Sequence, residues 1–317
     1  MPRGPPPPQL CRGVDVVSRR ELRAAGITDP RLQEAYEQCR RLNASHGRTY
    51  YLATLLLPPA KRPYVHALYG FARYADELVD DLRSPDPAAL ATWGATFLRD
   101  LDAADAFDVR HPVSRAAIHT ARTWDIPRAT FEAFLASMAM DATVTGYPTY
   151  GALEQYMYGS AAVIGLQMVP ILEPVDDRAA AHARVLGEAF QMSNFIRDIA
   201  EDLQRGRIYL PQEDLDKFDV TRADLRPGRT PSNVRDLLQF EIARTRELYA
   251  AAEPGIDMLH PTSRDCIRTA FTLYGGILDA VEAADLQVLD RRVAVPLRRR
   301  LAVAGPALLR ARRARAG

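Results

Sequence analysis

Residues 64–82 read YVHALYGFARYADELVDDL, and the interpretation of the whole chain starts from this stretch. Its apolar residues recur at spacings of three and four, which is the period of an amphipathic α-helix. Four polar side chains nevertheless follow one face of that helix at spacings of 4, 3 and 4, namely Tyr69, Arg73, Asp76 and Asp80. The two carboxylates would repel each other at this distance, and a bound cation would remove the penalty.

A second stretch, GEAFQMSNFIRDIAEDLQ at 187–204, repeats the pattern. Its oxygen donors follow one face at spacings of 3, 4 and 4, namely Gln191, Asn194, Asp198 and Asp202. A single Asp-x-x-x-Asp pair is typical of a solvated acidic surface, but two such helices, each backed by apolar residues and an arginine, favour a shared site. Oxygen donors select a hard cation, and Mg²⁺ commonly takes one or two carboxylates together with substrate phosphates. The two helices therefore predict a binding site for magnesium and a diphosphate. Arginine can also bind the diphosphate, because its planar guanidinium donates paired hydrogen bonds to phosphate oxygens.

The remaining sequence predicts an all-α fold. The chain has 317 residues, of which 47% are hydrophobic and 26% charged, so it can bury a large core. Strand-like alternation is almost absent, while apolar residues keep helical spacing in six segments, 61–82, 128–141, 150–169, 176–204, 232–252 and 262–289. Helix starts are predicted where a capping side chain precedes proline, at Asp29-Pro30, Asp86-Pro87 and Thr230-Pro231.

These signals predict one domain of about ten helices at 28–296. A flexible Pro/Arg-rich leader is expected at 1–27 and an Arg-rich tail at 297–317. Nine arginines and no acid follow Asp290, which is typical of a solvated or disordered basic segment; contact with anionic lipid is the alternative.

Composition excludes several classes of protein. Basic and acidic residues number 41 and 40, so no overall field attracts nucleic acid. The three cysteines lack a CxxC spacing, which argues against a disulfide framework or a structural zinc site and makes the cytoplasm the expected location. No apolar run of about 18 residues and no GxGxxG or P-loop sequence is present, so neither a membrane span nor a usual nucleotide site is predicted.

Three ordered stretches resemble the squalene/phytoene synthases: LLPPAKRPYVHALYGFARYADELVDD (56–81), QYMYGSAAVIGLQMVPIL (155–172) and GEAFQMSNFIRDIAEDLQRGRIYLP (187–211). The similarity runs from about Thr28 to Pro296. It implies an isoprenoid (terpenoid) synthase fold, with helices around a central cavity. It also implies that magnesium ions bridged to the substrates' diphosphates are held by Asp76, Asp80, Asn194, Asp198 and Asp202.

The resemblance assigns further roles. It implies catalytic roles for the four aspartates and for a tyrosine in the family's tyrosine-bearing motif, without distinguishing Tyr156 from Tyr158. Substrate contacts are implied for Tyr69, Arg73, Gln191, Arg197 and Tyr274, and we expect Arg207 to join them. His46, Arg48 and Thr49 match a phosphate-contacting loop in which Gly47 stands where some relatives have serine.

The expected reaction is the head-to-head condensation of two C20 geranylgeranyl diphosphates to phytoene, with Mg²⁺ (or Mn²⁺) and without NADPH. An enzyme that uses C15 farnesyl diphosphate to make dehydrosqualene, presqualene diphosphate or squalene is the alternative, and a non-catalytic assembly protein of the same fold is a third reading. Small residues at 159–162 and 165 either leave room for a prenyl chain or pack helices closely. Because substrate and product are greasy, peripheral contact with the inner face of the membrane is expected; the sequence does not indicate an oligomeric state.

Overall fold

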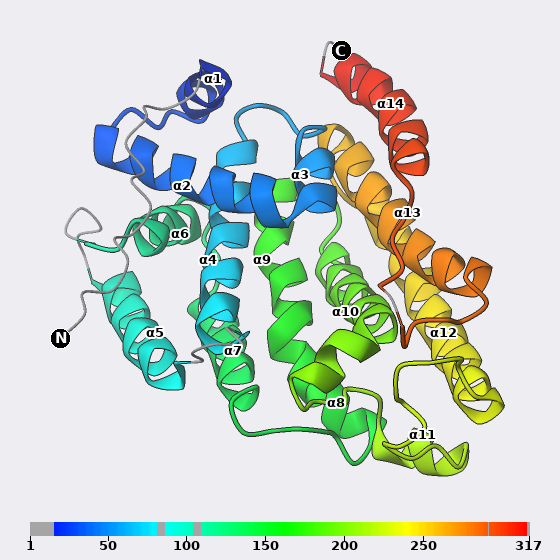
Figure 1. The fold of residues 1–317 in the computed structure, drawn as a ribbon. Coiled ribbons are helices and arrows are strands. Elements are labelled where there is room, and N and C mark those ends of the chain that lie inside the picture. Colours follow the sequence, from blue (N-terminus) through cyan, green and yellow to red (C-terminus); the bar gives the residue numbers. More distant parts are fainter. Residues whose placement is uncertain (1–15, 81–85, 104–108, 291, 316–317) are drawn as a thin grey trace.

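The structure is a computed structural model that describes residues 16–80, 86–103, 109–290 and 292–315 (Figure 1). The helices of these ranges are α1 (Val16–Ala24), α2 (Pro30–His46), α3 (Arg48–Thr54), α4 (Arg62–Asp80), α5 (Pro87–Asp102), α6 (Pro112–Thr123), α7 (Arg128–Met140), α8 (Tyr150–Met157), the π-helical turn η1 (Tyr158–Ala162), α9 (Val163–Leu172), α10 (Ala179–Gln204), α11 (Gln212–Lys217), α12 (Ser232–Ala252), the 3₁₀ turn η2 (Glu253–Ile256), α13 (Pro261–Ala283) and α14 (Leu297–Ala314). Within them no strand forms, and only two isolated β-bridges occur. The all-α prediction is confirmed, and helices exceed the expected ten partly because several are nine residues or shorter.

Two of the three predicted helix starts have the expected cap. Asp29 accepts a hydrogen bond from the backbone N–H of Leu32 at 2.8 Å, and Asp86 caps α5 in the same way. The third prediction is wrong in detail, because α12 begins at Ser232 and the Thr230 hydroxyl donates to the backbone oxygen of Leu286 instead. Tertiary contact with the chain after α13 thus replaces the local cap.

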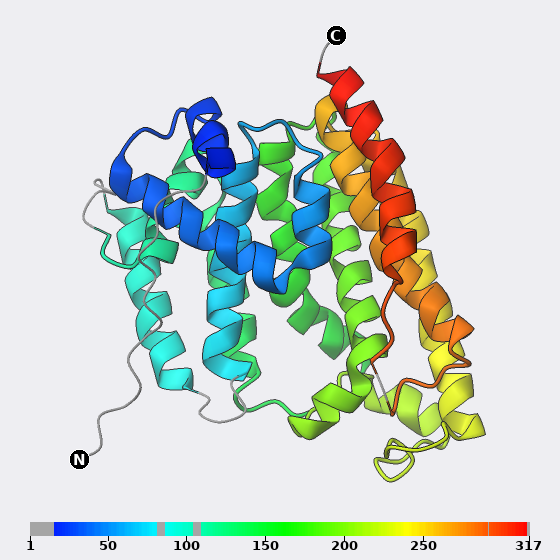
Figure 2. The ribbon, with the colours of Figure 1, turned by 45° about the horizontal axis from the view of Figure 1, so that its top comes forward.

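Three central helices position the site. α4, α9 and α10 run beside one another, with α2 crossing α4 and with α12 to α14 along the side of α10 (Figures 1 and 2). The core behind α4 is aromatic: Phe71 is completely buried, and its ring lies 4.6 Å from Phe97 and 5.2 Å from Phe131 between centroids. Because this core fixes one face of α4, the opposite face of the helix is turned towards α9 and α10.

The ends of the chain differ from the expected flexible segments. Residues 1–15 of the expected leader lie outside the described residues, but α1 is ordered, since Leu22 joins the core and Glu21 accepts from Arg62 Nη1 at 2.6 Å. At the other end α14 is a helix packed on α13, because its small residues Ala304, Ala307 and Ala311 fall on one buried face. The expectation of a solvated tail therefore does not hold for 297–314.

No helix of the described ranges combines the length and the apolar character that crossing a bilayer requires.

Candidate active site

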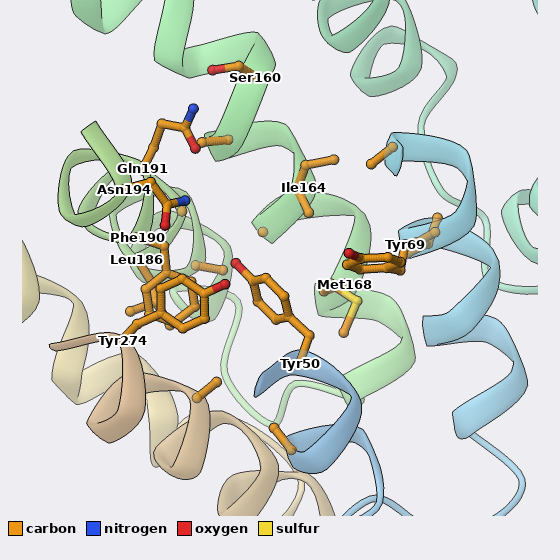
Figure 3. A pocket seen from close by; sticks show the side chains of 18 of the residues that line it. Tyr50, Tyr69, Ser160, Ile164, Met168, Leu186, Phe190, Gln191, Asn194 and Tyr274 are labelled. Atoms are coloured by element: carbon orange, nitrogen blue, oxygen red, sulfur yellow. The ribbon is translucent and has the colours of Figure 1, made fainter. Parts of the chain in front are cut away.

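A cavity of about 560 Å³ lies among α3, α4, α9, α10 and α13 (Figure 3). Its size is within the range of about 300–1,000 Å³ that holds small-molecule ligands. Residues of α10 line it from Ala179 to Asp202, and the rise of about 1.5 Å per residue makes the stretch from Ala179 to Asp198 about 28 Å long. Acidic and basic side chains gather where α4 and α10 end, whereas the other end is lined by apolar residues such as Leu172, Ile256 and Leu259. The cavity is therefore polar at one end and apolar at the other.

The first acidic stripe faces this cavity. Tyr69, Arg73 and Asp76 all line it from α4. Arg73 donates to Asp76 through Nη1 at 2.7 Å and to Glu77 through Nε at 3.0 Å, so the guanidinium bridges two carboxylates. Asp80 is the last residue of α4, and its side chain lies outside the described residues.

The second stripe faces the first across the cavity. Gln191, Asn194, Asp198 and Asp202 all line it from α10. Arg197 holds Asp198 with Nε at 2.7 Å from Oδ1 and Nη2 at 2.5 Å from Oδ2. Burial opposes the charge of Arg197, but the adjacent Asp198 carboxylate raises its pKa above the ordinary value. These four residues therefore line the same cavity as Tyr69, Arg73 and Asp76 of the first stripe.

The donor set at the polar end fits a hard cation. Asn194 lines the cavity, and its buried Oδ1 has no hydrogen-bond partner among the described residues, so the acceptor capacity of this carboxamide oxygen is unused there. Asp198 and Asp202 follow it one and two turns along α10, and Asp76 adds a carboxylate from α4. Among the described side chains, which do not include that of Asp80, no three from His, Cys, Asp or Glu are placed so that they could hold a metal ion by themselves. Magnesium sites of this kind are completed by phosphate oxygens and water.

Aromatic rings cover one wall next to the polar end. Tyr274 of α13 stacks on Phe190 of α10 with centroids 4.5 Å apart, and Tyr50 of α3 lies 4.8 Å from Tyr274 (Figure 3). Burial raises the pKa of Tyr69 to about 12 and also raises the pKa values of Tyr50 and Tyr274. At neutral pH this wall consists of uncharged phenols and a phenyl ring.

The two tyrosines that the sequence could not separate lie in different surroundings. Tyr156 is buried, lines the cavity and donates from its hydroxyl to Asp141 Oδ2 at 2.8 Å. Tyr158 is 41% exposed, is not among the residues that line the cavity, and has its ring 5.6 Å from the guanidinium carbon of Arg184. Side chains two positions apart on a helix point in directions that differ by about 200°, so only one of Tyr156 and Tyr158 can face the cavity.

Residues 46–49 lie near the polar end without lining the cavity. His46 Nε2 is 3.8 Å from Glu77 Oε1, and neither Arg48 nor Thr49 is among the lining residues. Gly47 is close-packed: a Cβ there would lie 2.6 Å from the ring of Tyr69. The glycine therefore permits the position of Tyr69.

Arg207, for which a substrate contact is expected, contacts the segment after α7. Its side chain is buried, is not among the residues that line the main cavity, and donates from Nη2 to the backbone oxygen of Asp141 at 2.8 Å. The chain turns sharply after α10, where Gly206 has a positive φ of 81°, and this turn directs Arg207 towards the segment after α7. The Arg207 side chain therefore binds the backbone at Asp141.

The small residues of α9 and η1 mainly serve close packing. A Cβ on Gly159 would lie 2.2 Å from the backbone oxygen of Ala133, and a Cβ on Gly165 would lie 2.2 Å from that of Ala183. Gly165 also lines the cavity, together with Ala161. Close approach of the helices and space for a ligand therefore occur together.

The family model for "Squalene/phytoene synthase" matches residues 43–299, which include both acidic helices and the tyrosine segment. The chain belongs to this family. It is 36% identical over 294 residues to the 15-cis-phytoene synthase of Synechocystis sp., with 88% of this chain and 86% of that protein covered. It is 34% identical over 295 residues to the phytoene synthase of Arthrospira platensis, covering 88% and 94%. The crystal structure of a dehydrosqualene synthase in complex with ligand matches with a TM-score of 0.79 at 26% identity, covering 87% and 96%.

In this squalene/phytoene synthase family member, several cavity residues carried no sequence signal. Arg292 donates from Nε to Asp198 Oδ1 at 3.0 Å and places Nη1 3.4 Å from Glu201 Oε2. It is 94 positions from Asp198 and lies among many arginines, so spacing could not single it out. Asn43 and Asp141 also line the cavity from helix ends outside the recognised motifs.

Proposed function

We propose that this chain is a phytoene synthase, which joins two geranylgeranyl diphosphates head to head through prephytoene diphosphate and releases phytoene and diphosphate. The observation that carries this proposal is the 34–36% identity to proteins named phytoene synthase over 88% of the chain. The cavity is consistent with this proposal, because its polar end suits a diphosphate group and its apolar end suits a prenyl chain. Both acidic stripes point into the same space.

The polar end provides for departure of diphosphate. Asp76, Asn194, Asp198 and Asp202, with Asp80 at the end of α4, would hold Mg²⁺, or Mn²⁺ in its place. When bound, the metal neutralises charge that develops on the leaving diphosphate. Arg197 and Arg292 both contact Asp198. They are positioned to donate hydrogen bonds to phosphate oxygens once another cation neutralises the Asp198 carboxylate.

The walls of the cavity provide for the carbocation that remains. Tyr50, Phe190 and Tyr274 present aromatic surface, which attracts a cation through the ring faces. Ile164 and Met168 of α9 line the opposite wall (Figure 3). These side chains exclude water, so the second prenyl chain competes successfully for the cation.

Product analysis tests the proposal. Purified protein is given Mg²⁺ and either geranylgeranyl or farnesyl diphosphate, without NADPH, and the extract is analysed by mass. We expect a C40 hydrocarbon from the C20 substrate. A C30 hydrocarbon or presqualene diphosphate as the main product would overturn the C20 assignment and favour the C15 alternative, which the likeness to a dehydrosqualene synthase supports.

Failure of the folded protein to turn over either substrate would favour the third reading, a non-catalytic protein. Chelation with EDTA, followed by addition of Mg²⁺ or Mn²⁺, tests the metal separately: activity should disappear and return.

We also propose that α14 attaches the protein to the inner face of the cytoplasmic membrane. Outside the face that carries its buried alanines, α14 exposes Leu301 and Leu309, which are 58% and 59% exposed. Among the described residues, Arg298, Arg312 and Arg313 have no acidic partner and flank these leucines. An apolar strip with cationic ends is typical of a helix that lies in the interface of an anionic bilayer.

Vesicle sedimentation tests this attachment. Each basic residue near an anionic surface contributes about 1 kcal/mol, so Arg312→Gln/Arg313→Gln should weaken binding to phosphatidylglycerol vesicles by roughly thirtyfold. The matched control Arg222→Gln/Arg226→Gln removes the same charge from the exposed loop before α12 and should bind as the unaltered protein does. Equal binding of both variants would refute the role of α14.

A further inference from the structure

A buried carboxylate outside the recognised motifs organises the tyrosines at the polar end of the cavity. Asp141, the residue after α7, lines the cavity and is only 9% exposed. Tyr156 donates to its Oδ2 at 2.8 Å, and Tyr209 donates to its Oδ1 at 3.0 Å. Arg207 fixes the Asp141 backbone from the other side. The Asp141 carboxylate therefore accepts hydrogen bonds from hydroxyl groups on two different segments of the chain.

This arrangement determines what the tyrosines can offer a ligand. A phenol has one hydroxyl proton and an oxygen with lone pairs that accept hydrogen bonds. Because the protons of Tyr156 and Tyr209 are both directed to Asp141, each oxygen can only accept a further hydrogen bond. The Tyr209 oxygen accepts one from Arg207 Nη1 at 3.5 Å. The acceptor capacity that borders the space for substrate is therefore that of Tyr156, which lines the cavity.

The cluster lies beside the diphosphate end of the cavity. The ring of Tyr209 stacks on Phe195 with centroids 4.1 Å apart and an interplanar angle of 11°. Phe195 directly follows Asn194 on α10, one residue from the predicted metal ligands. The carbon that carries diphosphate in a prenyl substrate must lie at this end. The tyrosines therefore border the carbons that become positively charged.

We propose that Asp141 is the positioning residue that makes Tyr156 the proton acceptor in the last step, the loss of a proton from the final C40 cation. This inference rests on the proposed function. In the step, a C–H bond next to the cationic carbon breaks and its electron pair forms the new C=C bond. The proton bonds to the Tyr156 oxygen as the hydroxyl proton of Tyr156 passes to the Asp141 carboxylate. Tyr156 is then neutral again, and Asp141 releases the proton to water when the product leaves.

The ratio of prephytoene diphosphate and C40 alcohols to the C40 hydrocarbon tests the proposal. Asp141→Asn keeps the shape of the side chain but removes the charge that accepts a proton. We expect KM for geranylgeranyl diphosphate and the rate of forming prephytoene diphosphate to stay within about threefold. The rate of hydrocarbon formation should fall by about a hundredfold, the usual contribution of a positioned acid or base. Prephytoene diphosphate and C40 alcohols, formed when water captures the cation, should accumulate instead.

Two comparisons separate this role from support of the fold. Tyr147→Phe is the matched control, because the ring of Tyr147 packs 5.3 Å from that of Tyr156 while its buried hydroxyl has no hydrogen-bond partner in the part of the chain that the structure describes. This variant should keep the partition of the unaltered protein. Asp141→Glu should restore hydrocarbon in part, and Asp141→Asn combined with Tyr156→Phe should lose no more hydrocarbon than either change alone.

An unchanged product ratio in Asp141→Asn would overturn the inference. Parallel loss of the intermediate and the hydrocarbon, or an equal shift in Tyr147→Phe, would do the same, because either indicates a general structural role. If the unaltered protein makes a C30 hydrocarbon instead, the C20 assignment fails, and the same partition is measured with farnesyl diphosphate. If it makes no hydrocarbon from either substrate, the proposed function fails and this inference fails with it.

Discussion

Replacing Gly165 by alanine tests the close approach of α9 and α10, the two helices that shape one side of the cavity. The added Cβ would lie 2.2 Å from the backbone oxygen of Ala183 and 2.9 Å from its carbonyl carbon. Ordinary contacts begin at 3.4 Å, so the helices would have to separate by about 1.2 Å. No side-chain rotation can relieve the contact, because both atoms belong to the backbone.

The magnitude follows from two opposing effects. Alanine is favoured over glycine within a helix by roughly 0.5–1 kcal/mol, while overpacking a tight interface costs about 1–3 kcal/mol. Because the clash is with backbone, we expect the overpacking cost to be at the upper end of its range and the free energy of unfolding to fall by about 2 kcal/mol.

Urea unfolding followed by far-UV circular dichroism measures this change as a shift of the midpoint. Gly275→Ala is the matched control: it also lies within a helix, and its Cβ would meet only the ring of Tyr249 at 3.7 Å. It should be neutral or stabilising by the intrinsic preference alone. The reasoning is refuted if Gly165→Ala is as stable as Gly275→Ala, since the helices would then separate without cost.

Three further predictions concern the site and its surroundings. Gly47→Ser should lower kcat/KM for the prenyl diphosphate by about tenfold, because the new Cβ displaces the ring of Tyr69; steady-state kinetics that match the unaltered protein would contradict the close packing. Burial lowers the pKa of His66 from 6.5 to about 3, so between these pH values the unfolded chain takes up a proton that the folded chain does not. The free energy of unfolding should therefore decrease on acidification by up to about 1.4 kcal/mol per pH unit, and urea titrations of His66→Gln should show a shallower dependence; an unaltered slope would argue against a buried neutral imidazole. Asp80→Asn and Asp198→Asn should each abolish turnover while far-UV circular dichroism shows full helicity, and near-normal turnover in either would remove that residue from the metal site.

The acidic stripes were predictable because their geometry is local. Side chains three and four positions apart share a helix face whatever surrounds the helix, so Tyr69 with Asp76, and Asn194 with Asp198, could be placed together from spacing alone. The caps at Asp29 and Asp86 were predictable for the same reason. The resemblance to squalene/phytoene synthases then implied that the two stripes meet.

Other features depended on contacts between distant segments. Arg292 reaches Asp198 across 94 positions, and nothing in an arginine-rich stretch distinguishes the arginine that does so. The arginines of 297–314 suggested a solvated tail, whereas α14 docks on α13 through alanines on one helix face and through the ion pairs Arg299–Asp279 and Arg310–Asp265. Such contacts require the positions of both partners, which a local pattern does not contain.

The sequence by itself determined that the chain is all-α, that two helices each carry a row of oxygen donors on one face, and which family it resembles. The tertiary structure decided that Tyr156 faces the cavity and Tyr158 does not, that Arg207 holds backbone, and that Asp141 receives the hydroxyls of Tyr156 and Tyr209. The physical reason is that helical periodicity fixes only the angle between neighbouring side chains. The direction in which the whole set points is decided by the helices that pack against it.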